Sequence, residues 1–75
     1  MANAAALLVN VKTKLGKTVP DYAKKLSADP TGGNMARAER ELFDLLTSMR
    51  NSTRKELFAQ DTRLQVWFAD QTCDA

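Results

Sequence analysis

The fold is decided by residues 35–49, which read Met35-Ala-Arg-Ala-Glu-Arg-Glu-Leu-Phe-Asp-Leu-Leu-Thr-Ser-Met49. Apolar side chains recur in this stretch at spacings of three and four residues, at Met35, Ala38, Leu42, Leu45 and Met49. This spacing places them on one face of a helix. A helix with one apolar face must bury that face, either within its own domain or against a partner. The pattern therefore predicts a helix over residues 35–51.

The composition of the chain favours helices over β-sheet. Its 75 residues include no isoleucine and only four valines, whereas Ala, Leu, Lys, Arg and Glu are abundant. These abundant residues favour helices, and the scarce ones are typical of strands. A chain of this length is sufficient for one domain. We therefore predict an all-α fold, in which residues 1–75 form a single small bundle of four to five short helices.

Capping and turn signals set the expected helix boundaries. The expected helices span residues 3–15, 19–27, 35–51, 54–60 and 62–71. The expected N-caps are Asn3, Thr18, Asn34 and Asp61. Gly16 is predicted to end the first helix, and Thr53 with Glu56 forms a capping box that would start the fourth. Residues 28–34 are rich in turn formers and are expected to form an internal loop, and residues 72–75 a frayed C-terminal tail.

A second architecture is also compatible with the periodicity. Apolar residues alternate along residues 7–15 and again along 64–68, which is the period of a strand. If both segments were strands, they could pair in a small α+β fold. We prefer the helical interpretation because an isolated pair of strands is only marginally stable in water.

The absence of histidine and the single cysteine limit the chemistry that this chain can perform. Without histidine, the chain lacks the commonest general base and the commonest zinc ligand. Cys73 has no second cysteine with which to form an internal disulfide, which is typical of a reducing cytoplasm. The apolar run at residues 4–9 follows no Lys or Arg and is too short to cross a bilayer. We therefore expect a cytoplasmic, non-enzymatic protein that has no cofactor, no metal and no membrane association.

Two surfaces are candidates for binding. The first is predicted to bind a larger protein and combines the outer face of the helix at residues 35–51 with the aromatic C-terminal segment, where tryptophan is a typical interface anchor. Its predicted residues are Arg37, Arg40, Glu41, Asp44, Trp67 and Phe68. The second is a basic surface that would attract nucleic acid through its charge. Its predicted residues are Lys12, Lys14, Lys17, Lys24, Lys25, Arg50, Arg54 and Lys55.

The expected function is protein–protein interaction. Small histidine-free chains that need no cofactor are common among accessory proteins of phages and mobile elements, and we expect an inhibitor or regulator of a host protein. A homodimer is a further expectation, because the chain has few large apolar side chains with which to build a core alone. The alternative function is a nucleic-acid-binding transcriptional regulator that uses the lysine-rich N-terminal third. Residues 21–27 resemble the first helix of a helix-turn-helix, but the loop that follows is too long for that motif.

Overall fold

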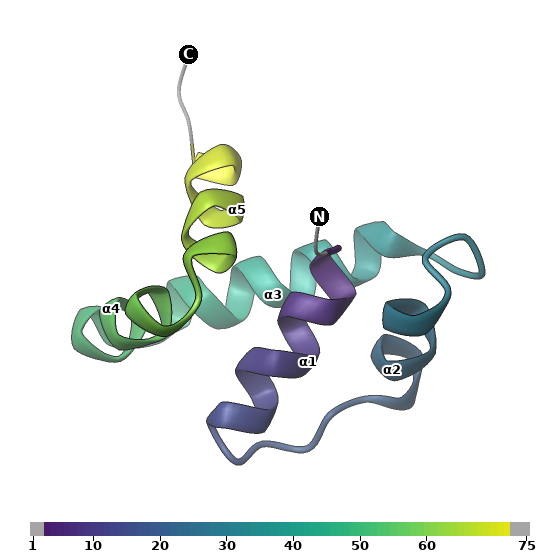
Figure 1. The fold of residues 1–75 in the computed structure, drawn as a ribbon, viewed down its shortest axis with the longest axis horizontal. Coiled ribbons are helices and arrows are strands. Elements are labelled where there is room, and N and C mark those ends of the chain that lie inside the picture. Colours follow the sequence, from purple (N-terminus) through teal and green to yellow (C-terminus); the bar gives the residue numbers. More distant parts are fainter. Residues whose placement is uncertain (1–2, 73–75) are drawn as a thin grey trace. The chain divides into compact units, whose positions relative to one another are not determined.

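The computed structural model describes residues 3–72, and within them it contains five helices and no strand. The helices are α1 (Ala4–Lys14), α2 (Asp21–Ala28), α3 (Met35–Ser48), α4 (Asn51–Gln60) and α5 (Thr62–Thr72), as Figure 1 shows. The predicted all-α fold is confirmed. The alternative with strands at 7–15 and 64–68 is wrong, because burial in α1 follows helical spacing: Leu7, Leu8 and Val11 are buried, whereas Thr13 is exposed.

The chain forms two compact units, Met1–Leu42 and Phe43–Ala75, which divide within α3. The first unit contains α1, α2 and the N-terminal half of α3, and the second contains the rest of α3 with α4 and α5. The single domain expected over residues 1–75 stays a prediction. Of the predicted tail at residues 72–75, only Thr72 is described, and it ends α5; Cys73 lies outside the described residues.

In the first unit, α1 and α2 pack against each other. The side chain of Asn3 accepts a hydrogen bond from the Ala6 amide at 2.8 Å, which confirms it as the N-cap of α1. Gly16 follows the helix with a φ of +69°, a left-handed conformation that favours glycine, as predicted for the helix end. The core of this unit is made of small and branched apolar side chains: Ala4, Ala5, Leu7, Leu8, Val11, Ala23, Leu26, Ala38 and Leu42.

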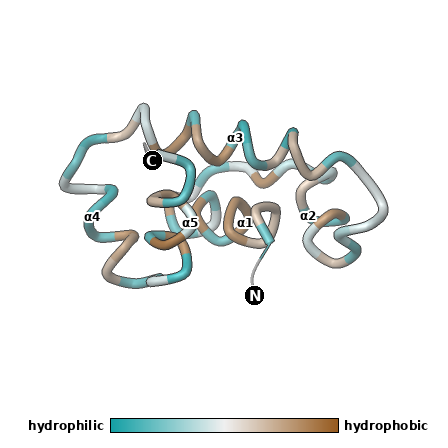
Figure 2. Tube along the Cα trace, turned by 90° about the horizontal axis from the view of Figure 1, so that it is seen from above, coloured by the Kyte–Doolittle hydropathy of each residue, from teal (hydrophilic) through white to brown (hydrophobic). Residues whose placement is uncertain are grey.

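The buried stripe of α3 is narrower than the predicted heptad: of the five predicted residues, Ala38 and Leu42 are buried, Met35 is half-buried like Leu45, and Met49 lies beyond the end of α3 at Ser48. Ala38, Leu42 and Leu46 are completely buried, whereas Leu45 and Met49 are only half-buried. Leu45 and Leu46 lie on opposite sides of Leu42 around the helix axis, because adjacent residues of a helix are separated by about 100°. The sequence pattern selected Leu45, but the structure buries Leu46 more deeply. Figure 2 shows the resulting division of α3 into a hydrophobic and a hydrophilic side.

In the second unit, α4 packs against α5 and begins earlier than predicted. Its first residue is Asn51, so the proposed capping box of Thr53 and Glu56 is wrong, since both residues lie inside the helix. The guanidinium of Arg54 explains the early start. It donates to the Leu46 carbonyl at 2.7 Å and to the side chain of Asn51, which ties the end of α3 to the first turn of α4.

Of the three remaining predicted N-caps, two are confirmed and one is wrong. The Asn34 side chain accepts from the Ala36 amide at 3.1 Å, and that of Asp61 accepts from the Arg63 amide at 3.1 Å, which confirms both caps. The predicted cap at Thr18 is wrong because α2 begins only at Asp21, after Pro20.

Candidate functional site

Four polar side chains form one connected cluster in the first unit, here called the Tyr22 cluster: Lys12, Tyr22, Arg37 and Glu41. The Tyr22 hydroxyl donates to Glu41 Oε1 at 2.7 Å, and Lys12 Nζ lies 3.3 Å from Glu41 Oε2. The guanidinium carbon of Arg37 lies 3.9 Å from the centroid of the Tyr22 ring. The cluster therefore connects α1, α2 and the N-terminal half of α3 through side chains alone.

The surroundings of Tyr22 keep its phenol protonated. Burial is the largest effect, and with the hydrogen bond to Glu41 and the charge of that carboxylate it raises the pKa of Tyr22 from 10.0 to about 12. The positive charge of Arg37 acts in the opposite direction. The hydroxyl therefore remains a hydrogen-bond donor to Glu41 even at pH values at which a solvated phenol would lose its proton. The predicted partner residue Glu41 and the predicted nucleic-acid residue Lys12 thus have contacts within the unit.

The other charged residues predicted on α3 are exposed. Arg37 and Arg40 lie in the first unit and Asp44 in the second, and all three side chains reach solvent. Arg37 differs from the other two because one face of its guanidinium is covered by the Tyr22 ring. Of the four residues predicted here, the structure therefore brings only Arg37 and Glu41 together, through Tyr22.

Three phenylalanines form an aromatic cluster in the second unit. The ring centroid of Phe68 lies 5.7 Å from that of Phe43 and 5.6 Å from that of Phe58. These distances are typical of favourable aromatic pairs. The sequence prediction included Phe68 but missed Phe43 and Phe58. One signal could have found them, because both end the same short pattern, a basic residue followed by Glu-Leu-Phe, at 40–43 and 55–58.

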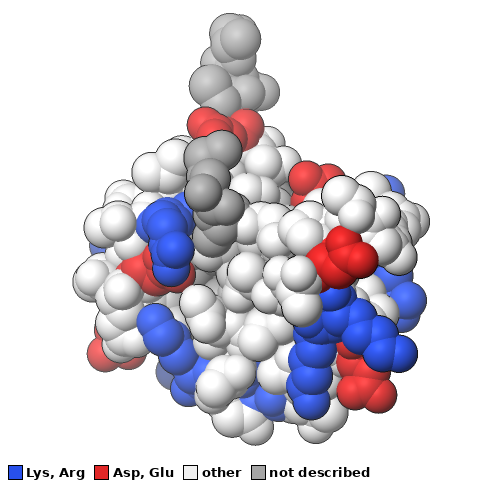
Figure 3. Space-filling model, turned by 45° about the vertical axis from the view of Figure 1, so that its right-hand side comes forward, with Lys and Arg blue, Asp and Glu red and all other residues white. Residues whose placement is uncertain are grey.

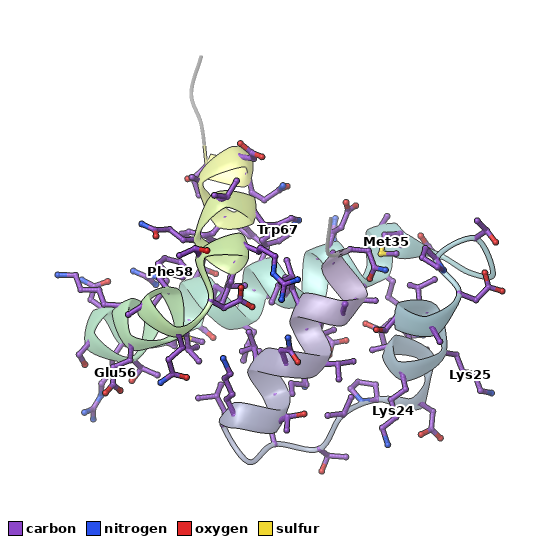
Figure 4. All side chains as sticks on the ribbon, in the orientation of Figure 1. Lys24, Lys25, Met35, Glu56, Phe58 and Trp67 are labelled. Atoms are coloured by element: carbon purple, nitrogen blue, oxygen red, sulfur yellow. The ribbon has the colours of Figure 1, made fainter. Side chains whose placement is uncertain are left out.

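The apolar side chains of α5 are only partly covered. Val66 is 61% exposed, and its neighbours Trp67 and Phe68 are half-buried. Figure 4 shows Trp67 on α5 and Phe58 on α4. Only Leu46, Leu57 and Leu64 are buried in this unit among the described residues. Among the described residues of the second unit, Val66 is thus the large apolar side chain with an exposed surface, and Trp67 and Phe68 are partly accessible beside it.

The basic residues predicted to bind nucleic acid do not share one environment. Lys12 pairs with Glu41, and Arg54 is hydrogen-bonded to Leu46 and Asn51. The others are exposed: Lys14, Lys17, Lys24, Lys25, Arg50 and Lys55. Lys24 and Lys25 extend outwards from α2 in Figure 4. On the face drawn in Figure 3, acidic side chains lie next to basic ones, so the basic groups there do not form an uninterrupted surface.

Residues 3–72 contain neither a helix that could span a membrane nor a cluster of metal-ligating side chains. No helix there has both the length and the apolar character needed to cross a bilayer. In this part of the chain, no group of three or more acidic or cysteine side chains is placed so that it could hold a metal ion.

No family model, curated protein or solved structure matches this chain.

Proposed function

We propose that this chain is a non-enzymatic interaction module that binds a larger protein and modulates it. The observation that supports this proposal is the apolar run Val66-Trp67-Phe68 on α5, whose side chains are partly in water. Val66, with 61% of its surface exposed, is the extreme case. Apolar area removed from water contributes roughly 25 cal/mol per Å² to association. A partner that covers this run would therefore gain stability from it.

The residue types in this run suit a protein partner. Trp and Phe are enriched at the centres of protein interfaces, where charged residues are depleted. The Phe68 ring pairs with the rings of Phe43 and Phe58, so Phe68, the neighbour of Trp67 on α5, is held in place before any partner binds. A preformed surface loses less conformational freedom on binding than a mobile one. This combination favours recognition of a protein over recognition of nucleic acid.

The cellular setting belongs to the same proposal. The chain's small size, its single cysteine and its lack of histidine support a cytoplasmic accessory protein of a phage or mobile element that inhibits or regulates a host protein. Nucleic-acid binding has weaker support, because Lys12 and Arg54 make contacts within the protein. A homodimer through the α5 surface is a further outcome that the test below separates.

The test compares capture of a partner by the wild type and by Val66→Asp. Tagged protein is exposed to nuclease-treated extract of the organism that encodes it, and captured proteins are quantified by mass spectrometry. Gln65→Asp is the matched control, since Gln65 is an exposed neighbour on α5 and the added charge is the same. We expect one protein to be lost with Val66→Asp and retained with Gln65→Asp, while circular dichroism shows both variants folded.

Three results would contradict the proposal. Equal capture by both variants would show that α5 is not the binding surface. Material that is captured from untreated extract but not from nuclease-treated extract would identify nucleic acid as the ligand. A wild type that captures only its own copies, and sediments as a dimer that Val66→Asp dissociates, would assign the surface to self-association.

A further inference from the structure

A hollow of about 400 Å³ lies in the first unit, between α2 and the start of α3. Its apolar lining comes from Tyr22 and Leu26, and its cationic lining from Lys25 and Arg37. We propose that this hollow binds a carboxylate side chain presented by an acidic segment of a partner protein. The inference rests on the proposed function in taking its ligand from a protein, but it uses a different surface and a different chemistry.

Arg37 is held in a position suited to a carboxylate. Its guanidinium carbon lies 3.9 Å from the centroid of the Tyr22 ring, and that ring is fixed by the hydrogen bond from its hydroxyl to Glu41. Stacking covers a face of the guanidinium and leaves the N–H groups at its edge available in the plane. No Asp or Glu within residues 3–72 forms an ion pair with Arg37. The side chain is thus ordered before a ligand arrives, which reduces the entropic cost of binding.

A second cation and backbone donors border the same hollow. Lys25 follows Tyr22 by three residues and therefore lies on the same side of α2. It is exposed and has no ion-pair partner in the described part of the chain. The amides of Gly33 and Asn34 precede the positive end of α3 and donate to no other group within residues 3–72. An anion in the hollow would meet both kinds of donor.

Glycine at position 33 keeps the hollow open. A Cβ atom there would lie 3.4 Å from Leu26 Cδ1, so a longer side chain would occupy the space above Leu26. The one acidic residue of the lining, Asp29, is partly satisfied by its own loop. Its Oδ1 accepts from the Thr31 hydroxyl at 2.8 Å and from the Thr31 amide at 3.3 Å. Two cations against this one carboxylate leave the hollow with a net positive charge.

The charges favour a peptide carboxylate over nucleic acid. Nucleic acid binds to rows of cations that follow successive phosphates, whereas this hollow holds two cations with a carboxylate between α2 and α3. A planar guanidinium matches a planar carboxylate with two parallel hydrogen bonds. Residues 1–42 contain seven basic and four acidic residues, which attracts an acidic segment over longer distances. An acidic peptide is therefore the occupant that the charges fit.

The test measures binding of a hexaglutamate peptide with blocked ends to the full chain at low salt. Amide NMR locates the site, and calorimetry gives the affinity. Arg37→Ala should weaken binding about tenfold and Lys25→Ala about threefold, since each removes a cation that faces the ligand. The matched controls are Arg40→Ala and Lys24→Ala, which remove the same charges from exposed positions that do not line the hollow. Both controls should change the affinity less than about twofold.

Several results would overturn the inference. Equal losses in all four variants would show unspecific attraction to a basic unit, and unshifted Gly33 and Asn34 amides would place the peptide elsewhere. Tighter binding of inorganic phosphate or of duplex DNA than of the peptide would assign the hollow to phosphate groups.

If no peptide binds while Val66→Asp still abolishes partner capture, the proposal that the hollow binds a carboxylate is wrong and the proposed function stands. If the peptide binds as expected but no partner is captured through α5, the proposed function alone fails.

Discussion

Tyr22 is the only tyrosine in the chain, and we predict that it loses its proton about two pH units later in the folded protein than in the unfolded one. Burial raises the pKa of Tyr22 from 10.0 to about 12, and the hydrogen bond to Glu41 and the charge of Glu41 add to the effect. Arg37 partly opposes it. Because there is one tyrosine, the absorbance of tyrosinate reports this single group.

The free energy of unfolding should fall at alkaline pH, because the folded protein holds the Tyr22 phenol proton more tightly than the unfolded chain does. Below pH 10 both states keep the phenol proton, so the stabilisation is fully present. As pH rises from 10.0 towards about 12, the unfolded chain loses the proton while the folded one retains it. The free energy of unfolding therefore falls, by at most about 1.4 kcal/mol per pH unit. The full shift of about two units corresponds to a loss of at most about 2.7 kcal/mol, which is an upper bound because solvent screens a partly exposed ring.

The assay combines an absorbance titration with urea unfolding at several alkaline pH values. Tyr22→Phe supplies the baseline and should show no fall in stability that is assignable to the phenol. Glu41→Gln removes the carboxylate charge, so its tyrosine should titrate at lower pH than in the wild type. Its midpoint should still exceed 10.0, since burial is the largest cause of the shift and is unchanged. Circular dichroism at each pH verifies that the helices persist.

A tyrosine midpoint of 10.0 in a protein that remains helical would refute this reasoning, because it would mean that the phenol is solvated. An unchanged midpoint in Glu41→Gln would instead remove Glu41 from the explanation. A fall in stability of equal size in Tyr22→Phe would assign the alkaline transition to lysines.

Three further predictions concern stability, measured by urea unfolding. Leu42→Ala should cost about 2–5 kcal/mol because Leu42 is completely buried, whereas Leu45→Ala should cost about 1 kcal/mol; equal costs would contradict the burial difference. Asn3→Ala should cost about 1 kcal/mol through loss of the α1 cap, with no comparable effect of Ala at the exposed Asn10. Arg54→Lys should cost about 1–2 kcal/mol, since an ammonium cannot reproduce the two bonds of the guanidinium, and a neutral result would disprove that link between α3 and α4.

The helix ends that the sequence predicted correctly depend on neighbouring residues alone. Asn3, Asn34 and Asp61 each accept from an amide two or three residues further along, so their spacing in the sequence is sufficient. The start of α4 depends instead on Arg54 reaching the carbonyl of Leu46, eight residues earlier. A capping pattern cannot include such a contact. The predicted start was therefore too late.

The separation in sequence between interacting residues also explains why the sequence did not predict all of the candidate site. Charge patterning placed Arg37 and Glu41 on the polar face of α3, and their identity as charged surface residues was sufficient for that. The hydrogen bond that organises them comes from Tyr22, 19 residues before Glu41. Tyr22 was not among the predicted site residues, because nothing near it in the sequence indicated that its hydroxyl would meet a carboxylate of α3. Its role became visible only once α2 and the start of α3 were packed.

Each unit contains an arginine that lies over an aromatic ring, but the two arginines differ in the hydrogen bonds that their guanidinium groups make. The guanidinium carbon of Arg54 lies 5.6 Å from the Phe68 centroid, and its edge donates to Leu46 and Asn51. Arg37 lies closer to its ring, at 3.9 Å, and its edge meets no acceptor within residues 3–72. The Arg54 guanidinium makes two hydrogen bonds within the fold, whereas the Arg37 guanidinium makes none within residues 3–72 and still has donors to offer. Stacking on an aromatic ring alone therefore does not identify a binding arginine. Arg37 is distinguished because its guanidinium is stacked, its N–H groups have no acceptor within residues 3–72, and it lines a hollow.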